Sequence, residues 1–363
     1  MSDSPLKLLS PYEGTSLSTP NRVAMAPMTR NRAGESRTPN DLMATYYAQR
    51  STAGLLVSES ADVSPRAIGY PGTPGLYRRD QIEGWKRVVA AVREAQVAPA
   101  PFFCQLFHTG RVSHRSLKPD GSSPVAPSAV ATKEVQLYTP EGMVPCSPPL
   151  AMSAMQIQET IQEYVQAAKG AIEAGFDGVE VNGGNGYLVD QFLRDATNRR
   201  TDGYGGNASR RVRFLVDLVD ALSGAIGASR VAVRVSPMNP TNEVSDSDPV
   251  TLFTTVADAL SGRGLAYLHV IENAAFATVT RKMRERYPGT FIVNDGYGRE
   301  EAERAIQSGL ADLVSFGKAF LANPDLPRRF AEGAPLNEPD MATFYGGTDA
   351  GYTDYPALQA VSK

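Results

Sequence analysis

Residues 179–193 carry the sequence VEVNGGNGYLVDQFL, the most informative stretch of the chain. Its apolar beginning follows residues 174–176 (AGF) and is typical of a buried parallel strand. Asn182, Asn185 and Tyr187 then place two amides and a phenol within six residues. If the chain turns into a helix there, the two amides lie on one face, with Cβ atoms about 5–6 Å apart, and can grip one oxygen atom. Polar groups at the C-terminal end of a barrel strand are typically catalytic, so this segment predicts an active site.

Short apolar runs recur along the chain, with helical stretches between them. Eight runs have the length and continuity of buried strands: 23–25, 55–58, 101–106, 178–181, 231–235, 265–271, 290–293 and 312–316. Apolar residues at helical spacing predict helices over 81–95, 157–174, 210–223, 249–261 and 300–308. Strands that alternate with helices indicate a parallel α/β architecture, and eight such units in 363 residues indicate a (β/α)8 TIM barrel.

The units are unevenly spaced, and the widest gap follows the third strand. Residues 107–155 are rich in Ser and Pro, a composition typical of loops and short hairpins. A long insertion after a barrel strand lies on the catalytic face, so we expect residues 107–155 to cap the active site. The residues before the first strand form a lead-in, and we expect residues 331–363 to pack on the barrel as a tail. Residues 1–363 are thus expected to form a single domain.

Composition argues against several classes of protein. The formal net charge is −3, so a broad attraction to nucleic acid is not expected. No apolar run approaches the ~20 residues that a membrane helix needs, and the N-terminus lacks the pattern of a signal peptide. Cys104 and Cys146 form neither a disulfide framework nor a metal-binding spacing. We therefore expect a reduced, cytoplasmic protein without a metal site.

Further motifs stand in a fixed order along the chain. They are AMAPMTR at 24–30, YYAQR at 46–50, GY at 69–70, QLFHTGR at 105–111, NRRTD at 198–202, FGK at 316–318 and NPDL at 323–326. Together with residues 179–193, they resemble the Old Yellow Enzyme family of FMN-dependent ene-reductases over nearly the whole chain. The sequence GYTDYP at 351–356 resembles the branch that includes bacterial nitroester and enone reductases.

The resemblance implies a non-covalent FMN at the C-terminal face of the barrel, with NADPH or NADH as a transient hydride donor. The implied cofactor contacts are Ala26, Pro27, Met28, Thr29, Ser60, Gln105, Arg234, Asn294, Gly296, Gly317 and Lys318. The sequence marks two of them independently, because a buried amide such as Gln105 needs a partner and a buried Arg234 needs a counter-charge. Lys318 stands where the family commonly has arginine, and lysine lacks a bidentate fork. Gly184-x-Gly186 begins like a dinucleotide loop, but Val189 stands at the third glycine position, so we expect no Rossmann site.

The resemblance also implies a substrate site. Asn182 and Asn185 would bind the substrate carbonyl or nitro group, and Tyr187 would donate the proton. The implied pocket walls are Tyr70, Phe107 and Tyr345. The family usually has His-x-x-Asn or His-x-x-His where this chain has Asn-x-x-Asn. An asparagine donates N–H but cannot become cationic, so polarisation of a carbonyl should persist while binding of a phenolate should weaken.

The expected function is the NAD(P)H-dependent reduction of activated C=C bonds by a ping-pong mechanism. Expected substrates are enones, maleimides and nitroalkenes, with nitroesters as a further class. Two alternatives stay open: a related flavoprotein that isomerises or desaturates a specialised metabolite, and a flavin-binding module with little turnover. The intact Tyr187 favours net reduction. The expected partners are small molecules, and the expected assembly is a monomer or a homodimer.

Overall fold

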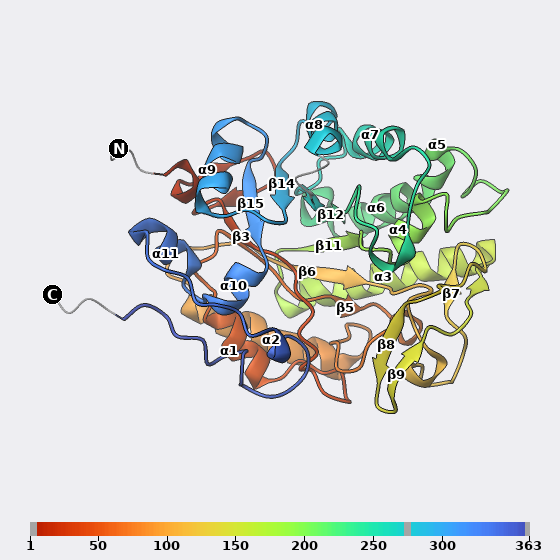
Figure 1. The fold of residues 1–363 in the computed structure, drawn as a ribbon, viewed down its shortest axis with the longest axis horizontal. Helices are drawn as coiled ribbons and strands as arrows, with labels where there is room; N and C mark the ends of the chain where they lie inside the picture. Colours follow the sequence, from red (N-terminus) through yellow and green to blue (C-terminus); the bar gives the residue numbers. More distant parts are fainter. Residues whose placement is uncertain (1–5, 272–276, 360–363) are drawn as a thin grey trace.

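Eight parallel strands close into a barrel in the computed structural model, which describes residues 6–271 and 277–359 (Figure 1). The barrel strands are β3 (Val23–Met25), β4 (Leu55–Val57), β6 (Phe102–Phe107), β11 (Gly178–Gly183), β12 (Val231–Val235), β13 (Leu268–Ile271), β14 (Phe291–Asn294) and β15 (Leu313–Phe316). The last strand pairs with the first, with Val314 opposite Val23, and so closes the barrel. A short extra strand, β5 (Ala61–Asp62), pairs with β6. All eight predicted strands are confirmed, and with them the predicted (β/α)8 fold.

Helices surround the barrel in the predicted alternation. They are α1 (Asp41–Ala48), α2 (Arg79–Ala95), α3 (Ala154–Ala174), α4 (Leu188–Leu193), α5 (Ala208–Arg211), α6 (Arg213–Ile226), α7 (Pro249–Leu260), α8 (Ala277–Arg286), α9 (Arg299–Gln307), α10 (Lys318–Ala322) and α11 (Leu326–Glu332). The five predicted helices are present, although the segment predicted at 210–223 divides into α5 and α6. Sequence determines the ends of α3, because Ser153 and Gln156 form a capping box at its start. Gly175 ends it with φ of 98°.

The interior of the barrel changes from apolar to polar along β6, β12, β13, β14 and β15. Its N-terminal layer is a cluster of buried apolar side chains that includes Phe103, Tyr267 and Ile292, and Leu17 of the lead-in packs into it. Leu17 lies between two short paired strands, β1 (Tyr12–Glu13) and β2 (Ser18–Thr19). Because side chains alternate along a strand, the next inward positions lie two residues on. Those positions carry polar side chains: Gln105, Arg234, His269, Asn294 and Ser315.

Residues 107–155 contain loops, short strands and a hairpin, and α3 begins only at Ala154. A 3-10 turn (Arg115–Leu117) comes first, and β7 (Val125–Ala126) pairs with β10 (Leu150–Ala151). Between them β8 (Gln136–Thr139) and β9 (Gly142–Pro145) form an antiparallel hairpin, drawn at the lower right of Figure 1. This agrees with the loop and hairpin composition of the sequence.

The C-terminal segment is fastened to the barrel by arginines in the loop that follows β3. Arg30 donates to the carbonyl of Phe344 at 2.9 Å, and Arg32 donates to that of Thr348 at 2.8 Å. The ring of Tyr352 stacks on Tyr46 of α1, with 4.0 Å between centroids. Figure 1 shows the blue C-terminal segment beside α1; of the predicted tail, residues 360–363 lie outside the described part. In that part of the chain, no helix combines the length and apolar character needed to cross a membrane.

Candidate active site

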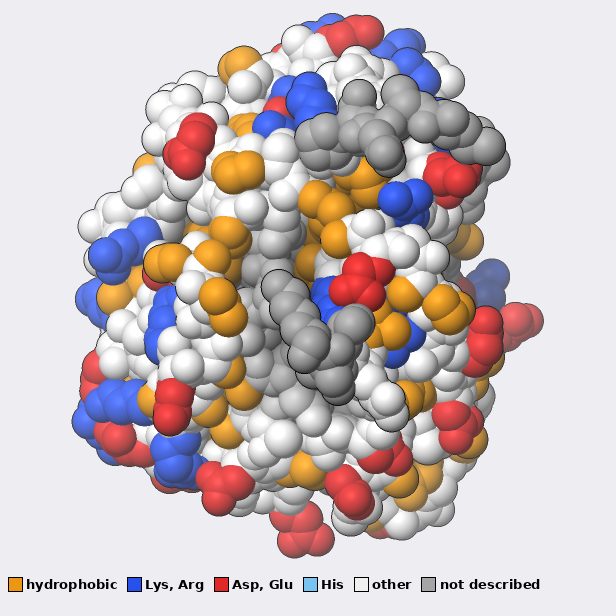
Figure 2. Space-filling model, turned by 90° about the vertical axis from the view of Figure 1, so that its left-hand side faces the viewer, with side chains coloured by type: hydrophobic (Ala, Val, Ile, Leu, Met, Phe, Trp, Pro, Cys, Tyr) orange, Lys and Arg blue, Asp and Glu red, His pale blue; other side chains and the backbone are white. Residues whose placement is uncertain are grey.

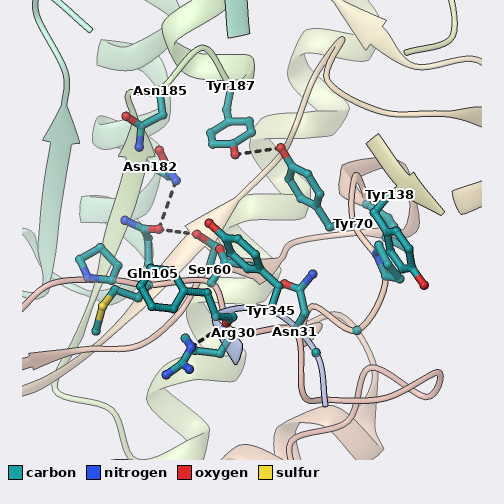
Figure 3. A pocket seen from close by; sticks show the side chains of 18 of the residues that line it. Arg30, Asn31, Ser60, Tyr70, Gln105, Tyr138, Asn182, Asn185, Tyr187 and Tyr345 are labelled. Atoms are coloured by element: carbon teal, nitrogen blue, oxygen red, sulfur yellow. Dashed lines mark hydrogen bonds between the residues drawn. The ribbon is translucent and has the colours of Figure 1, made fainter. Parts of the chain in front are cut away.

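A cavity of about 1460 Å³ opens at the C-terminal ends of the barrel strands. Most of the predicted site residues line it: Ala26, Pro27, Met28, Thr29, Ser60, Tyr70, Gln105, Asn182, Asn185, Tyr187, Arg234, Asn294, Gly317, Lys318 and Tyr345. Figure 3 shows how the labelled members of this set, from distant parts of the sequence, converge on one space. Phe107 and Gly296 are not among the lining residues. The ring of Phe107 packs edge-on against Tyr187 at 4.6 Å between centroids, behind the lining.

The amide of Gln105 is held in one orientation. Its Nε2 donates to the Glu180 carboxylate at 2.7 Å, and a carboxylate oxygen can only accept. Its Oε1 therefore faces the cavity side, where it accepts from Ser60 Oγ and, at 3.1 Å, from Asn182 Nδ2 (Figure 3). The buried amide thus finds protein partners and keeps an oxygen acceptor next to Asn182.

Glu180 and His269 form a buried network that the sequence analysis did not single out. His269 Nδ1 lies 2.9 Å from Glu180 Oε2, and His269 Nε2 lies 2.8 Å from Ser315 Oγ. Burial lowers the pKa of His269 below its usual range, so the imidazole is neutral near pH 7. A neutral ring that donates to a carboxylate through Nδ1 must accept at Nε2, so Ser315 is the donor there. Burial opposes the charge of Glu180, but the combined effect of His269, Arg234 and Gln105 lowers the pKa of this carboxyl.

Arg234 brings a positive charge into the polar end of the barrel. Its guanidinium donates to Asn294 Oδ1 at 2.7 Å, and Asn294 Nδ2 donates to the carbonyl of Ser315 at 2.9 Å. Nε of Arg234 is buried without a hydrogen-bond partner. Burial lowers the pKa of Arg234, and the charge of Glu180 opposes that shift. Glu180, which precedes Asn182 by two residues on β11, is therefore the counter-charge that Arg234 needs.

The chain between β11 and α4 forms a turn. The sequence placed the two amides on one face only on the condition that this segment is helical. Asn185 has φ of 55° and Gly186 has φ of 75°. A Cβ on Gly184 would lie 2.8 Å from Ser236 Oγ, and one on Gly186 would lie 2.5 Å from the carbonyl oxygen of Thr241. The two glycines therefore allow the turn to pack against the loop after β12. Asn182 and Asn185 both line the cavity, but from a strand end and a left-handed turn.

Tyr187 presents its phenol to the cavity opposite Tyr70. The two hydroxyl oxygens are 3.1 Å apart, and either hydroxyl can donate (Figure 3). Burial raises the pKa of Tyr187, and it raises that of Tyr70 further. Both phenols are therefore protonated at neutral pH, and Tyr187 can release a proton to a ligand.

Lys318 and several backbone groups lie where β14 and β15 end. Asp295 and Gly296 have φ of 92° and 78°, so the chain turns sharply after Asn294. Asn294, Asp295, Gly317 and Lys318 line the cavity. Lys318 is exposed, and no described side chain pairs with its ammonium group. In TIM barrels the loops after strands seven and eight often bind phosphate.

Comparison with known proteins places this chain in a family. Residues 7–337 match the NADH:flavin oxidoreductase / NADH oxidase family. The chain is 43% identical to 12-oxophytodienoate reductase 1 of Oryza sativa subsp. japonica over 369 residues, which cover 99% of this chain and 95% of that protein. The chain belongs to the Old Yellow Enzyme family.

Solved structures agree with this assignment. Morphinone reductase superposes with a TM-score of 0.93 at 42% identity, covering 99% of this chain and 98% of the other. Morphinone reductase in complex with tetrahydroNAD also gives 0.93, at 43% identity, covering 97% and 98%. The chain is therefore an FMN-dependent NAD(P)H oxidoreductase that acts on C=C bonds.

The residues around the cavity fit FMN. Arg234 offers a buried N–H without a protein partner, which a cofactor atom can accept. Lys318 offers an exposed cation beside a glycine, as a phosphate requires. The side chains of Gln105 and Ser60, which hydrogen bond to each other, give the cavity a polar floor.

Proposed function

We propose that this protein reduces C=C bonds conjugated to a carbonyl or nitro group. Enones, maleimides and nitroalkenes are the proposed substrates, with nitroesters as a further class. NADPH or NADH and the alkene would occupy the same cavity in turn, by a ping-pong mechanism. The bound FMN would accept a hydride from the nicotinamide and return it to the alkene. The names of the relatives support this reading, since both 12-oxophytodienoate and morphinone reductases are reductases of small molecules.

The cofactor would be held by the residues at the polar end of the barrel. Arg234 would place its positive charge and free Nε–H against the ring system, and Gln105 and Thr29 would contribute polar side-chain contacts. Lys318, with the backbone at Gly317, would hold the phosphate. Ser60, Asn294 and the segment Ala26–Met28 would complete the cradle, and Gly296 would allow the turn beside it. Supporting this assignment, all of these except Gly296 line one cavity.

The substrate oxygen would be held by the two asparagines. Asn182 and Asn185 each carry an Nδ2 group, and N–H donors polarise a carbonyl or nitro oxygen as charge develops on it. Both groups are neutral, so the pair would bind a neutral acceptor oxygen better than a phenolate. Tyr70, Tyr345 and the ring of Phe107 behind Tyr187 would shape the walls of the pocket.

The observation that carries the proposal is the position of the Tyr187 phenol. It lies in the same cavity as the two asparagines, it is protonated at neutral pH, and Tyr70 supplies its hydroxyl with a hydrogen-bond partner. This arrangement suits proton donation to a carbon atom of the bound alkene as hydride arrives at the other carbon.

The experiment is a comparison of the two half-reactions in the Tyr187→Phe variant. Reduction of bound flavin by NADPH needs no proton from Tyr187 and should keep its wild-type rate. Reoxidation by 2-cyclohexenone should slow by about 10²–10⁴-fold, the usual contribution of a general acid. Tyr204→Phe is the matched control, because its hydroxyl contacts Gln158 and Asp217 and does not line the cavity. Equal slowing of both half-reactions in Tyr187→Phe would contradict proton donation.

A further inference from the structure

Asn185 depends on a second asparagine in the loop after β12. Asn239 Nδ2 lies 3.0 Å from Asn185 Oδ1, and both residues line the cavity. The Asn185 backbone is fixed by the same loop: its N–H donates to Ser236 Oγ at 2.7 Å, and its carbonyl accepts from Asn242 Nδ2 at 2.8 Å.

The orientation of Asn239 follows from a backbone group. The N–H of Thr241 lies 2.9 Å from Asn239 Oδ1, and a backbone N–H can only donate. The Thr241 hydroxyl donates to the same oxygen. The oxygen of Asn239 must therefore face Thr241, and its Nδ2 must face Asn185.

The orientation of Asn185 then follows from that of Asn239. Since Asn239 presents a donor, Asn185 must present Oδ1 to it, and the Nδ2 group of Asn185 is left pointing away. No described residue accepts a hydrogen bond from this Nδ2. Amide groups otherwise have two orientations that differ only in which atom meets the ligand.

We propose that Asn239 is a positioning residue that holds Asn185 with its N–H bonds toward the substrate oxygen. The inference rests on the proposed function and adds to it a residue that acts through Asn185 rather than on the ligand. The hydrogen bond from Thr241 to Asn239 and that from Asn239 to Asn185 together make the Asn185 amide a fixed donor. Asn182 is fixed separately, since its Oδ1 accepts from the Gly184 N–H at 3.3 Å and its Nδ2 faces Gln105.

The substitution Asn239→Asp tests the proposal at constant shape. A carboxylate still accepts from Thr241 but cannot donate, so Asn185 turns over and presents Oδ1 to the cavity. Binding of the neutral ligand 2-cyclohexenone should weaken about tenfold, the loss of one hydrogen bond. In Asn239→Ala the Asn185 amide takes both orientations, so binding should weaken only about twofold. The two variants together distinguish orientation from simple loss of a side chain.

The measurement is a titration of the oxidised, FMN-loaded protein with 2-cyclohexenone, followed by the flavin absorbance. Asn207→Asp is the matched control, because among the described residues the exposed Asn207 side chain, at the start of α5, makes one hydrogen bond, which it accepts from the Arg210 N–H. The decisive comparison uses Asn185→Ala. In that background Asn239→Asp should have no further effect, whereas an effect on protein structure would persist.

Two results would overturn the inference: unchanged cyclohexenone affinity in Asn239→Asp, or an equal loss of affinity when Asn185 is already alanine. Bound FMN content should be the same in every variant. A different result would contradict the proposed function: NADPH would reduce the flavin of the wild-type protein, but no activated alkene would reoxidise it. Because the titration needs no turnover, the two failures are distinguishable.

Discussion

The two ends of the barrel interior are built from the same strands but have opposite chemistry. At the N-terminal end, Phe103 and Tyr267 pack ring against ring at 5.2 Å between centroids. Two residues further along the same strands, Gln105 and His269 both hydrogen bond to the Glu180 carboxylate. The rings of the apolar layer are held by volume and contact, whereas each polar group above them needs a partner of the right kind. Substitutions at positions two residues apart along the chain should therefore alter stability and ligand binding separately.

The largest expected effect on stability is at the apolar end. Phe103→Ala removes a buried ring that packs on Tyr267, so the free energy of unfolding should fall by about 3–5 kcal/mol. The FMN affinity of the folded protein should change little, because the polar end keeps its contacts. Urea unfolding of the apoprotein measures the first quantity, and FMN titration below the unfolding transition measures the second. A loss of FMN affinity as large as the loss of stability would show that the two ends are coupled.

A second buried carboxylate, that of Glu59, makes the stability of the protein depend on pH. Burial raises the pKa of Glu59 from about 4.5 to about 7. Since the folded protein holds this proton more tightly than the unfolded chain, its stabilising effect is complete below pH 4.5 and is lost as pH rises through 7. Glu59→Gln keeps an acceptor for the Arg30 N–H and cannot ionise. The variant should match the wild type near pH 4.5 and exceed its stability by about 3 kcal/mol at pH 8.

Urea unfolding at several pH values, with FMN held at saturation, provides the test of that difference. Parallel curves for wild type and Glu59→Gln would contradict the raised pKa. Glu180 provides the contrast, because its neighbours lower the pKa of its carboxyl, and the stability it contributes is lost as pH falls.

The smallest expected effect concerns the ligand alone. Asn182→His introduces a side chain that can become cationic beside the substrate oxygen, so a simple phenol should bind more tightly as its anion. We expect a gain of about 1–2 kcal/mol, the difference between charged and neutral hydrogen bonds. A phenol titration at matched pH, read from the long-wavelength band of the flavin, measures it. If the wild type already binds phenolate tightly and histidine brings no gain, the neutral pair serves anions well.

Sequence patterns predicted the eight strands because each is a continuous apolar run that the barrel buries on both faces. Most of the site residues that the family resemblance implies also line the cavity, because the motifs stand at strand ends. Glu180 and His269 were missed as a pair, although a charged or titratable side chain within an apolar strand was a visible signal of a buried partner. Asn239 gave no such signal, since its contact with Asn185 depends on how two turns pack. The turn at Asn185 could not be predicted, because the spacing of two amides cannot distinguish a helix from a left-handed turn.

The charged side chains on the face shown in Figure 2 have no comparable organisation. On the face shown in Figure 2, positive and negative side chains are interspersed, in keeping with the net charge of −3. Inside the barrel, by contrast, Glu180, Arg234 and their partners are removed from water. Charges in that environment act more strongly on a bound ligand than the same charges at the surface.

The most direct test of the central claim is an anaerobic redox cycle of the purified protein. The claim is that the polar end of the barrel holds FMN for the reduction of activated alkenes. The protein should be yellow, release FMN on acid treatment, lose its visible absorbance on addition of NADPH, and regain it on addition of 2-cyclohexenone with one alkene reduced per flavin. A protein that binds no FMN, or whose reduced flavin is reoxidised by no enone, maleimide or nitroalkene, would contradict it.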